Sequence, residues 1–129
     1  MQVISHDDLK THELPGLIHR TLSSKRNGNK RFEVWKQTIS GESATPVHKH
    51  DCEEVIVILK GAGDCWCEGK RYQFHADQTL VFPPNVVHQI INTGKDDLEI
   101  LASLSMSPVI VKTEDGTRLP LPWDTDGVE

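Results

Sequence analysis

Cysteine is scarce in this chain, and its spacing indicates no structural framework. The 129 residues include three cysteines, Cys52, Cys65 and Cys67, and no two of them are spaced as CxxC. An odd number of unpaired cysteines argues against a disulfide-stapled fold and fits a reducing compartment. Cys65 and Cys67 lie two residues apart on an expected strand, where their side chains point in parallel, so we expect free thiols.

Long hydrophobic runs and an excess of positive charge are also absent. The longest purely apolar run, residues 55–59, is too short to span a bilayer. The formal net charge is −5, with 19 acidic and 14 basic residues, which does not favour nucleic-acid binding. The basic cluster at residues 23–31 contains Asn-Gly-Asn and is interpreted as a solvated loop. Residues 1–10 lack the pattern of a secretory signal, so we expect a cytoplasmic protein with no membrane or nucleic-acid partner.

Short β-type patterns dominate the rest of the chain. Residues 31–40 alternate, with Phe32 and Val34 among the apolar positions, and residues 55–59 are rich in β-branched side chains. Two strands are expected within residues 65–75, two within residues 79–92 around a Pro-Pro-Asn turn, and one within residues 98–106. Many short strands separated by glycine, proline and asparagine predict an all-β antiparallel sandwich or barrel.

The length predicts a single domain spanning residues 1–129. Within it we expect an N-terminal arm over residues 1–30, a barrel over residues 31–107 and an extended, proline-containing tail over residues 108–129. Ser5 is a candidate cap for one short helical turn in the arm. The tail contains Trp123, and a tryptophan generally has a surface to pack against.

Two histidines one residue apart carry the first functional signal. His48 and His50 project from the same face of a strand, with Cα atoms about 6.6 Å apart, so their rings can converge on one ion. Glu54 would lie about 13 Å beyond His50 on a straight strand, so the chain must turn back at residues 51–53 to bring its carboxylate close. The alternative of two exposed histidines at a strand end stays open for this segment taken alone.

A third histidine favours the metal-site hypothesis. His88 follows the Pro-Pro-Asn turn and opens a β-branched strand, where its ring can face the first two. Asp77 and Asn85 occupy turn positions near that strand, and both residue types tolerate the left-handed backbone that such turns require.

The two histidine segments resemble the two motifs of the cupin family. The first motif, H-x-H-x3-E-x6-G, comprises His48, His50, Glu54 and Gly61, and the second comprises Pro83, Asn85, His88 and Asn92. The chain departs from the pattern at Gly41, one residue further from the first histidine than usual, and at Asp77 and Asn85, where glycines are commoner. The resemblance implies a double-stranded β-helix, or jelly-roll, barrel.

Most of the chain from Leu14 onward is similar to the plant auxin-binding protein branch of the cupins. The similarity lies in VWKQTISGESATPVHKHDCEEVIVILKGAG, HQIINTGKDDLEILASLSMSPVIV and the terminal LPWD. It implies a homodimer, and a divalent ion held by His48, His50, Glu54 and His88. It also implies that Trp123 folds back to wall an aromatic ligand pocket. The chain lacks the tail cysteine that would pin such an extension.

Three neutral imidazoles and one carboxylate around a divalent ion leave about one positive charge, which attracts a small anion. The body of such a ligand is expected to pack on Ile56, Ile58, Phe82 or Trp123. This mixed donor set suits zinc, iron, manganese or nickel.

Two functions are compatible with such a site. One is a module that binds a small anionic or aromatic molecule. The alternative is a metal-dependent enzyme, a dioxygenase, isomerase or cyclase, acting on a small carbonyl or enolisable substrate. An enzyme needs a proton shuttle or a redox metal, and the candidate shuttles are Glu53, His75 and Glu42.

Overall fold

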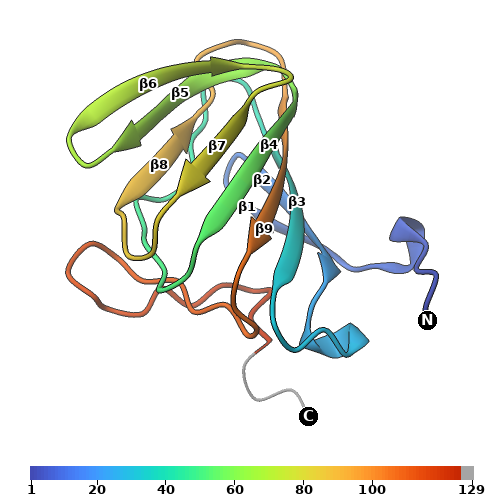
Figure 1. Cartoon of the computed structure of the whole chain (residues 1–129). Coiled ribbons are helices and arrows are strands. Elements are labelled where there is room, and N and C mark those ends of the chain that lie inside the picture. The colour runs from blue at the N-terminus through green and yellow to red at the C-terminus, as the bar shows by residue number, and fades with distance from the viewer. Residues whose placement is uncertain (126–129) are drawn as a thin grey trace.

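The computed structural model describes residues 1–125 as a barrel of two antiparallel sheets (Figure 1). The described strands are β1 Thr11–Leu14, β2 Leu17–Ser23, β3 Glu33–Ile39, β4 Glu54–Lys60, β5 Ala62–Cys67, β6 Lys70–His75, β7 Thr79–Phe82, β8 His88–Ile91 and β9 Leu98–Leu104. One sheet has the order β1-β2-β3-β9-β4-β7, and the other has the order β6-β5-β8. The all-β expectation is therefore confirmed. No helix in the described part of the chain is long and apolar enough to cross a membrane.

The smaller sheet continues past β8 through segments outside the named strands. His48 and His88 exchange backbone hydrogen bonds of 3.1 and 2.9 Å. On the other side, Lys49 and Lys112 exchange two bonds of 2.8 Å, which adds the start of the tail to this edge. The segment that carries the paired histidines is thus held between β8 and the C-terminal tail.

The N-terminal arm is shorter than the expected 1–30, and that boundary is wrong. Residues 11–23 form β1 and β2, which join the larger sheet through pairing of β2 with β3. Only residues 1–10 precede the sheet, and they include the short 3-10 helix η1, His6–Asp8, with Ser5 at its N-cap position. The predicted side-chain cap is absent there, because Ser5 makes no side-chain bond to the turn.

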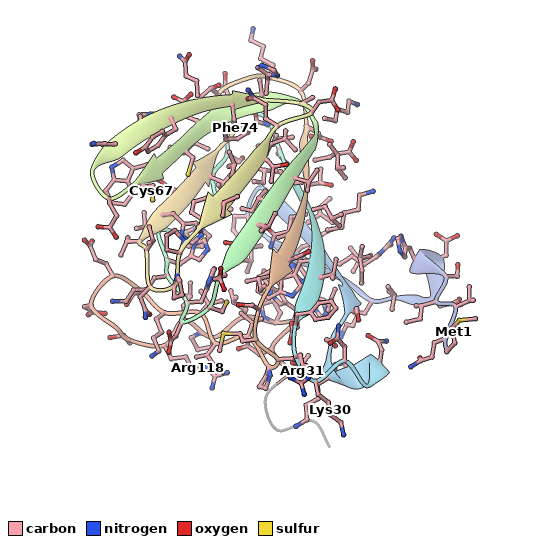
Figure 2. All side chains as sticks on the ribbon, in the orientation of Figure 1. Met1, Lys30, Arg31, Cys67, Phe74 and Arg118 are labelled. Carbon is pink, nitrogen blue, oxygen red and sulfur yellow. The ribbon has the colours of Figure 1, made fainter. Side chains whose placement is uncertain are left out.

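The basic loop lies where the sequence indicated. A second 3-10 helix, η2 Lys25–Asn27, is closed by a capping box from Ser24. Lys30 and Arg31 follow it and are exposed, as Figure 2 shows in the loop before β3. The solvated-loop interpretation is therefore confirmed.

Strand β3 buries the face opposite to the one its apolar pattern suggested. Phe32 is 47% exposed, whereas the buried positions of the strand alternate from Glu33 to Ile39. Two of those buried positions are polar, Glu33 and Gln37, and both find hydrogen-bond partners inside the barrel. Because a paired polar group can be buried at modest cost, hydrophobicity alone gave the wrong face.

Left-handed turns occur at the positions predicted for them. Glu68 and Gly69 both have positive φ, which gives the tight hairpin between β5 and β6, labelled at Cys67 and Phe74 in Figure 2. Asp77 and Asn85 have φ values of 67° and 62°, which confirms that they adopt the conformation for which glycine is commoner.

The core fills the space between the sheets, and its buried hydrophobic members are Leu17, Trp35, Ile39, Cys52, Ile56, Ile58, Cys65, Phe74, Phe82, Ile90, Leu98, Ile100, Ala102, Leu104, Val109, Val111 and Trp123. The last three belong to the tail, which crosses one end of the barrel (orange to red in Figure 1). The tail is therefore part of the core and not a free extension.

A buried carboxylate fastens the tail to β3. Glu33 is 1% exposed, and its Oε1 accepts a 2.9 Å bond from the indole of Trp35. Its Oε2 accepts bonds from the Val109 amide at 3.3 Å and from the Thr125 hydroxyl at 2.9 Å. One side chain thus joins the start and the last described residue of the tail to the sheet, in a chain whose three cysteines are all free.

A ring stack provides the second attachment of the tail. His19 on β2 stacks on Trp123 with ring centroids 3.7 Å apart and planes 6° apart, and meets Trp35 edge-on at 5.0 Å. Gln37 donates to His19 Nδ1, and His19 Nε2 donates to Thr21 at 2.7 Å. Burial, and secondly His12, lower the pKa of His19 from 6.5 to about 2. His19 is therefore neutral in the folded barrel.

We expect His19 to make the free energy of unfolding fall in acid. Below pH 6.5 the unfolded chain binds a proton that the folded barrel excludes until about pH 2, so stability is lost as pH falls across this range. The slope for one such group approaches about 1.4 kcal/mol per pH unit. His19→Phe keeps a ring on Trp123 but cannot titrate, so its stability measured by urea denaturation between pH 6 and 4 should depend less on pH. The exposed control His75→Phe should keep the wild-type slope, and equal slopes in all three proteins would contradict the assignment.

Candidate metal centre

The structure brings the four predicted ligands together from two sheets. Glu54 opens β4, His88 opens β8, and His48 and His50 lie on the segment between β8 and the tail. The chain bends at Asp51 and Cys52, as the spacing required, and this bend returns Glu54 to the histidines. One potential ligand atom from each of His48, His50, Glu54 and His88 lies within 4.8 Å of all the others.

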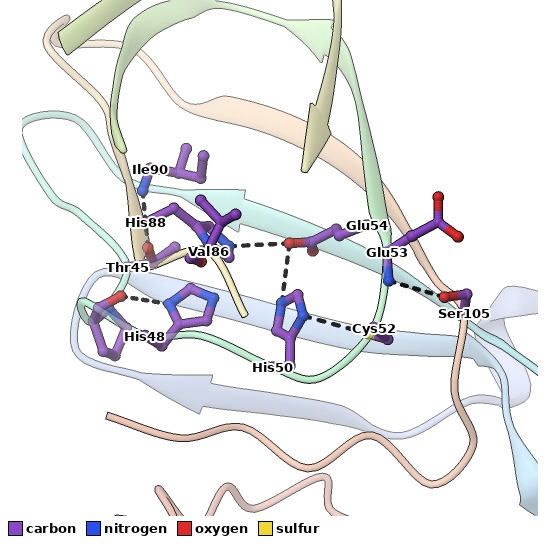
Figure 3. A network of polar contacts seen from close by, with 11 residues as sticks. Thr45, His48, His50, Cys52, Glu53, Glu54, Val86, His88, Ile90 and Ser105 are labelled. Carbon is purple, nitrogen blue, oxygen red and sulfur yellow. Dashed lines mark hydrogen bonds and ion pairs between the residues drawn. The ribbon is translucent and has the colours of Figure 1, made fainter. Parts of the chain in front are cut away.

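The closest contacts in the cluster converge on one carboxylate oxygen (Figure 3). His50 Nε2 lies 3.1 Å and His88 Nε2 3.0 Å from Glu54 Oε1. Two ligand atoms about 2.1 Å from one ion and at right angles to each other are separated by about 3.0 Å. The cluster therefore has the spacing of donors that share a first-row ion, and its three nitrogens and one oxygen are donors that such ions accept.

The outward nitrogens of the three imidazoles are also occupied. His48 Nδ1 donates to the Pro46 carbonyl at 2.6 Å, and His88 Nδ1 donates to the Val86 carbonyl at 2.8 Å. His50 Nδ1 instead lies 3.4 Å from the sulfur of Cys52. For His48 and His88 the carbonyl acceptors place a proton on Nδ1, so a bound ion would meet their Nε2 atoms, as ligation through Nε2 requires.

Electrostatics in the cluster favour a negative Glu54 carboxylate and an unprotonated His48. Burial alone raises the pKa of Glu54, but the hydrogen bonds and charges of His50 and His88 outweigh it and hold this pKa well below its usual range. Burial, and then the charge of His88, lower the pKa of His48 from 6.5 to about 4. Since a cation binds an ionised carboxylate and an unprotonated imidazole, both shifts suit metal binding near neutral pH.

An apolar cavity of about 40 Å³ lies beside the cluster. Its lining includes His48, Glu54 and His88, with the polar side chains Gln37 and Thr45. The apolar lining consists of Leu14, Leu17, Trp35, Pro46, Ile56, Ile90, Ile100, Val111, Leu119, Leu121 and Trp123. The volume has room for an ion and one or two small ligand atoms or waters.

The four predicted pocket residues separate into two pairs. Ile56 and Trp123 line the cavity, and Trp123 reaches it from the folded-back tail. Ile58 and Phe82 are buried but lie outside the cavity lining. Ile58 belongs to the core behind the cavity, and Phe82 stacks on the His88 ring with centroids 4.4 Å apart. Phe82 thus supports the His88 ring from behind and does not line the cavity.

The three candidate proton shuttles lie away from the cavity. Figure 3 shows the Glu53 side chain directed away from the imidazoles, and Glu53 is exposed. His75 is an exposed residue of β6, and Glu42 is exposed in a left-handed turn. None of the three lines the cavity in the described part of the chain.

Sequence reasoning missed two features of the site. Cys52 was given no role in the site, yet it contacts His50, and burial raises its pKa to about 12, so it stays a neutral thiol. Thr45 was not singled out, yet it exchanges three hydrogen bonds with residues 89 and 90 that hold the histidine segment beside β8. The available signal for Cys52 was its place inside the first motif, between the second histidine and the glutamate.

Comparison with known proteins agrees with this geometry. The family model described as "Auxin binding protein" matches residues 1–123. Auxin-binding protein 1 of Arabidopsis thaliana is 35% identical over 89% of this chain and 68% of its own length. Auxin-binding protein 4 of Zea mays is 30% identical over 91% of this chain and 63% of its own length. The chain thus spans about two thirds of the length of these relatives.

Solved structures of low sequence identity share the fold. The polyketide cyclase RemF of Streptomyces resistomycificus superposes with a TM-score of 0.73 and 20% identity, covering 96% of this chain and 89% of the cyclase. An RmlC-like cupin from Shewanella frigidimarina gives a TM-score of 0.72 at 16% identity, covering 83% of this chain and 92% of that one. The barrel is therefore the jelly-roll of the cupins. Because the family model and the relatives above match most of its length, this chain belongs to the auxin-binding protein family, and its fold is that of the cupins.

Proposed function

We propose that this protein binds one divalent metal ion through His48, His50, Glu54 and His88, and that the ion anchors a small anionic or aromatic molecule. The observation that carries the proposal is the meeting of these four donors beside an apolar cavity that His48, Glu54 and His88 line. Zinc suits three imidazoles and a carboxylate, and iron, manganese and nickel accept the same donors.

Charge determines the ligand class. Three neutral imidazoles, one carboxylate and a divalent ion sum to about one positive charge in an apolar surrounding. The residues that line the cavity in the described chain add no further charge, since their remaining polar members are Gln37 and Thr45. An anionic oxygen on the ion would neutralise the site, and the apolar walls would contact the rest of the ligand.

Cavity size determines how a larger ligand enters. About 40 Å³ admits a carboxylate group but not an aromatic ring. The tail contributes Leu119, Leu121 and Trp123 to the wall, so an aromatic acid requires these side chains to move outward. The relatives are named for auxin binding, and an acid of that kind is our first candidate for the larger ligand.

The alternative function, a metal-dependent enzyme, has less support. Proton transfer at the ion needs a titratable group near the ligand, and in residues 1–125 the cavity lining contains none besides the proposed metal ligands. The cyclase and the other fold relatives share the barrel at 16–20% identity, which says nothing about their chemistry here. We therefore favour the binding module.

The metal assignment is tested by removing one ligand. Wild-type protein purified without chelators should contain about one ion per chain, and His50→Ala should contain almost none because three donors hold an ion much less tightly. The control His75→Ala removes an exposed histidine and should keep the ion. The measurement is elemental analysis with circular dichroism to verify folding. Full occupancy in a folded His50→Ala protein would refute the ligand set.

The ligand assignment is tested by titration calorimetry of zinc-loaded and metal-stripped protein with acetate, benzoate and indole-3-acetate. Binding should require the ion, and Trp123→Ala should bind the two aromatic acids more tightly because the cavity becomes larger. Trp66→Ala is the matched control, since Trp66 is half-buried on β5 and does not line the cavity. Equal affinities with and without metal would contradict anchoring by the ion. Oxygen uptake or product formation in the same samples would favour the enzyme instead.

We also propose that the protein forms a homodimer through the outer face of the larger sheet. The apolar side chains exposed on or beside this face include Phe32 at 47%, Val55 at 36%, Leu59 at 44% and Val81 at 71%. Val55 and Val81 pair across β4 and the edge strand β7, so these two form a contiguous patch. Exposed patches of this kind mark association surfaces.

Val81→Lys should therefore shift the protein from dimer to monomer in light scattering coupled to size exclusion. Burying an unpaired lysine charge inside an apolar interface costs more binding free energy than a contact at the rim of that interface contributes. Tyr72→Lys is the control, because Tyr72 is 52% exposed on β6 of the other sheet. A monomeric wild type, or a dimer that both variants preserve, would contradict this interface.

A further inference from the structure

The three imidazoles of the cluster differ in what holds their outward nitrogens. His48 and His88 donate to backbone carbonyls, of Pro46 and Val86, which can only accept a hydrogen bond. His50 has the side chain of Cys52 in that place, with 3.4 Å between Nδ1 and Sγ. The same thiol is 4% exposed, so water has little access to this contact.

We infer that Cys52 is a positioning residue for the metal centre, whose sulfur accepts the Nδ1–H of His50 and holds that ring with Nε2 toward the ion. The inference rests on the proposed metal function and adds to it a residue that is not itself a ligand.

The geometry of His50 leaves one ring orientation for ligation. Its Nε2 is the nitrogen that faces Glu54, at 3.1 Å from Oε1, and the ring is 2% exposed. Ligation through Nε2 requires the proton on Nδ1, and a buried N–H needs an acceptor. Cys52 Sγ is the acceptor within reach in the described structure, and a thiol sulfur can serve in that role. Outer partners of this kind orient ligands and raise metal affinity.

The backbone on both sides of Cys52 is fixed, which keeps its sulfur in place. Before it, the Asn85 amide donates to the His50 carbonyl at 2.9 Å, and the Asn85 side chain donates to Asp51 at 3.0 Å. After it, the Glu53 amide donates to the Ser105 hydroxyl at 2.9 Å, and Ser105 returns a backbone bond of 3.0 Å to Glu53 (Figure 3). The bend that carries Cys52 is thus tied to the turn before β8 and to the end of β9.

The chain supplies a matched control for this role. Cys65 is a second buried thiol, 3% exposed, in the same core. Its sulfur contacts the Trp66 carbonyl at 3.8 Å and has no hydrogen bond to any of the four clustered residues. Removing it takes away a buried thiol without touching an imidazole, which separates loss of packing from loss of positioning.

The experiment measures zinc affinity by competition with a chromophoric chelator at pH 7 for wild type, Cys52→Ala, Cys52→Ser and Cys65→Ala. We expect Cys52→Ala to weaken zinc binding by about 10–100-fold, the usual effect of removing an outer partner of a ligand. Cys52→Ser keeps an acceptor and should stay within about threefold of wild type, and Cys65→Ala should match wild type.

Nitrogen-15 NMR of the histidine side chains distinguishes positioning from packing. In zinc-loaded wild type, His50 should carry its proton on Nδ1, and that proton should exchange slowly with water. In Cys52→Ala the His50 proton alone should exchange faster, while those of His48 and His88 stay slow because their carbonyl acceptors remain. A purely structural role would change all three protons or only the melting temperature.

The outcomes separate this inference from the proposed function. If wild type binds no zinc, the metal function fails and the inference fails with it. If wild type and Cys52→Ala bind zinc equally, the metal function stands and the role of Cys52 is refuted. Should Cys52→Ala not fold, two other results can still refute the inference. One is a zinc-loaded wild type in which His50 carries its proton on Nε2. The other is a loss of zinc affinity in Cys52→Ser while Cys65→Ala keeps the wild-type affinity.

Discussion

The ionised carboxylate of Glu54 is the constraint around which this barrel is organised. A carboxylate that is 4% exposed cannot stay charged without donors or a cation beside it. Its oxygen is met by His50 and His88, which come from two segments that are far apart in sequence. Because Glu54 opens a strand of the larger sheet and His88 opens a strand of the smaller one, satisfying this one charge also joins the two sheets. The site is therefore a structural element of the fold as well as its chemical centre.

The tail is likewise held by buried polar groups whose partners are distant in sequence. Glu33 receives donors from Trp35, Val109 and Thr125, and His19 stacks on Trp123 while both of its nitrogens are bonded. These contacts do without the covalent link that a tail cysteine would provide. Hydrogen bonds and stacking can open and re-form, whereas a disulfide in the same place would not. A tail that lines the cavity and is held by such contacts can move locally without unfolding the barrel.

The convergence of His48, His50, Glu54 and His88 was predictable from sequence, and most of the errors concern polar residues inside the barrel. The alternation of side chains along a strand and the bend at residues 51–53 were sufficient to predict that His48, His50 and Glu54 meet. The Pro-Pro-Asn turn before the next strand was sufficient to place His88. The buried face of β3 was missed because Glu33 is satisfied by donors 76 and 92 residues away, which no local pattern reveals. Strand β2 was read as part of an arm for a related reason, since its inward face includes a histidine. Ile56 and Ile58 share one face of β4, so strand alternation could not distinguish Ile56, which lines the cavity, from Ile58, which lies behind it.

Backbone pairing connects the tail wall of the cavity with the segment that carries the first two histidines. The tail residues that wall the cavity continue into Lys112, which is paired by two backbone bonds with Lys49, the residue between the two motif histidines. A small carboxylate fits without disturbing that pairing. An aromatic acid bound as proposed would displace the wall, and the Lys49 pairing would connect that displacement to the segment that carries His48 and His50. The opposite side of this segment is held by the His48 and His88 backbone pair, which resists the movement. Binding of a large ligand would therefore stress the first motif more than the second, and a favourable contact between the ligand and the proposed ion would have to compensate for that stress.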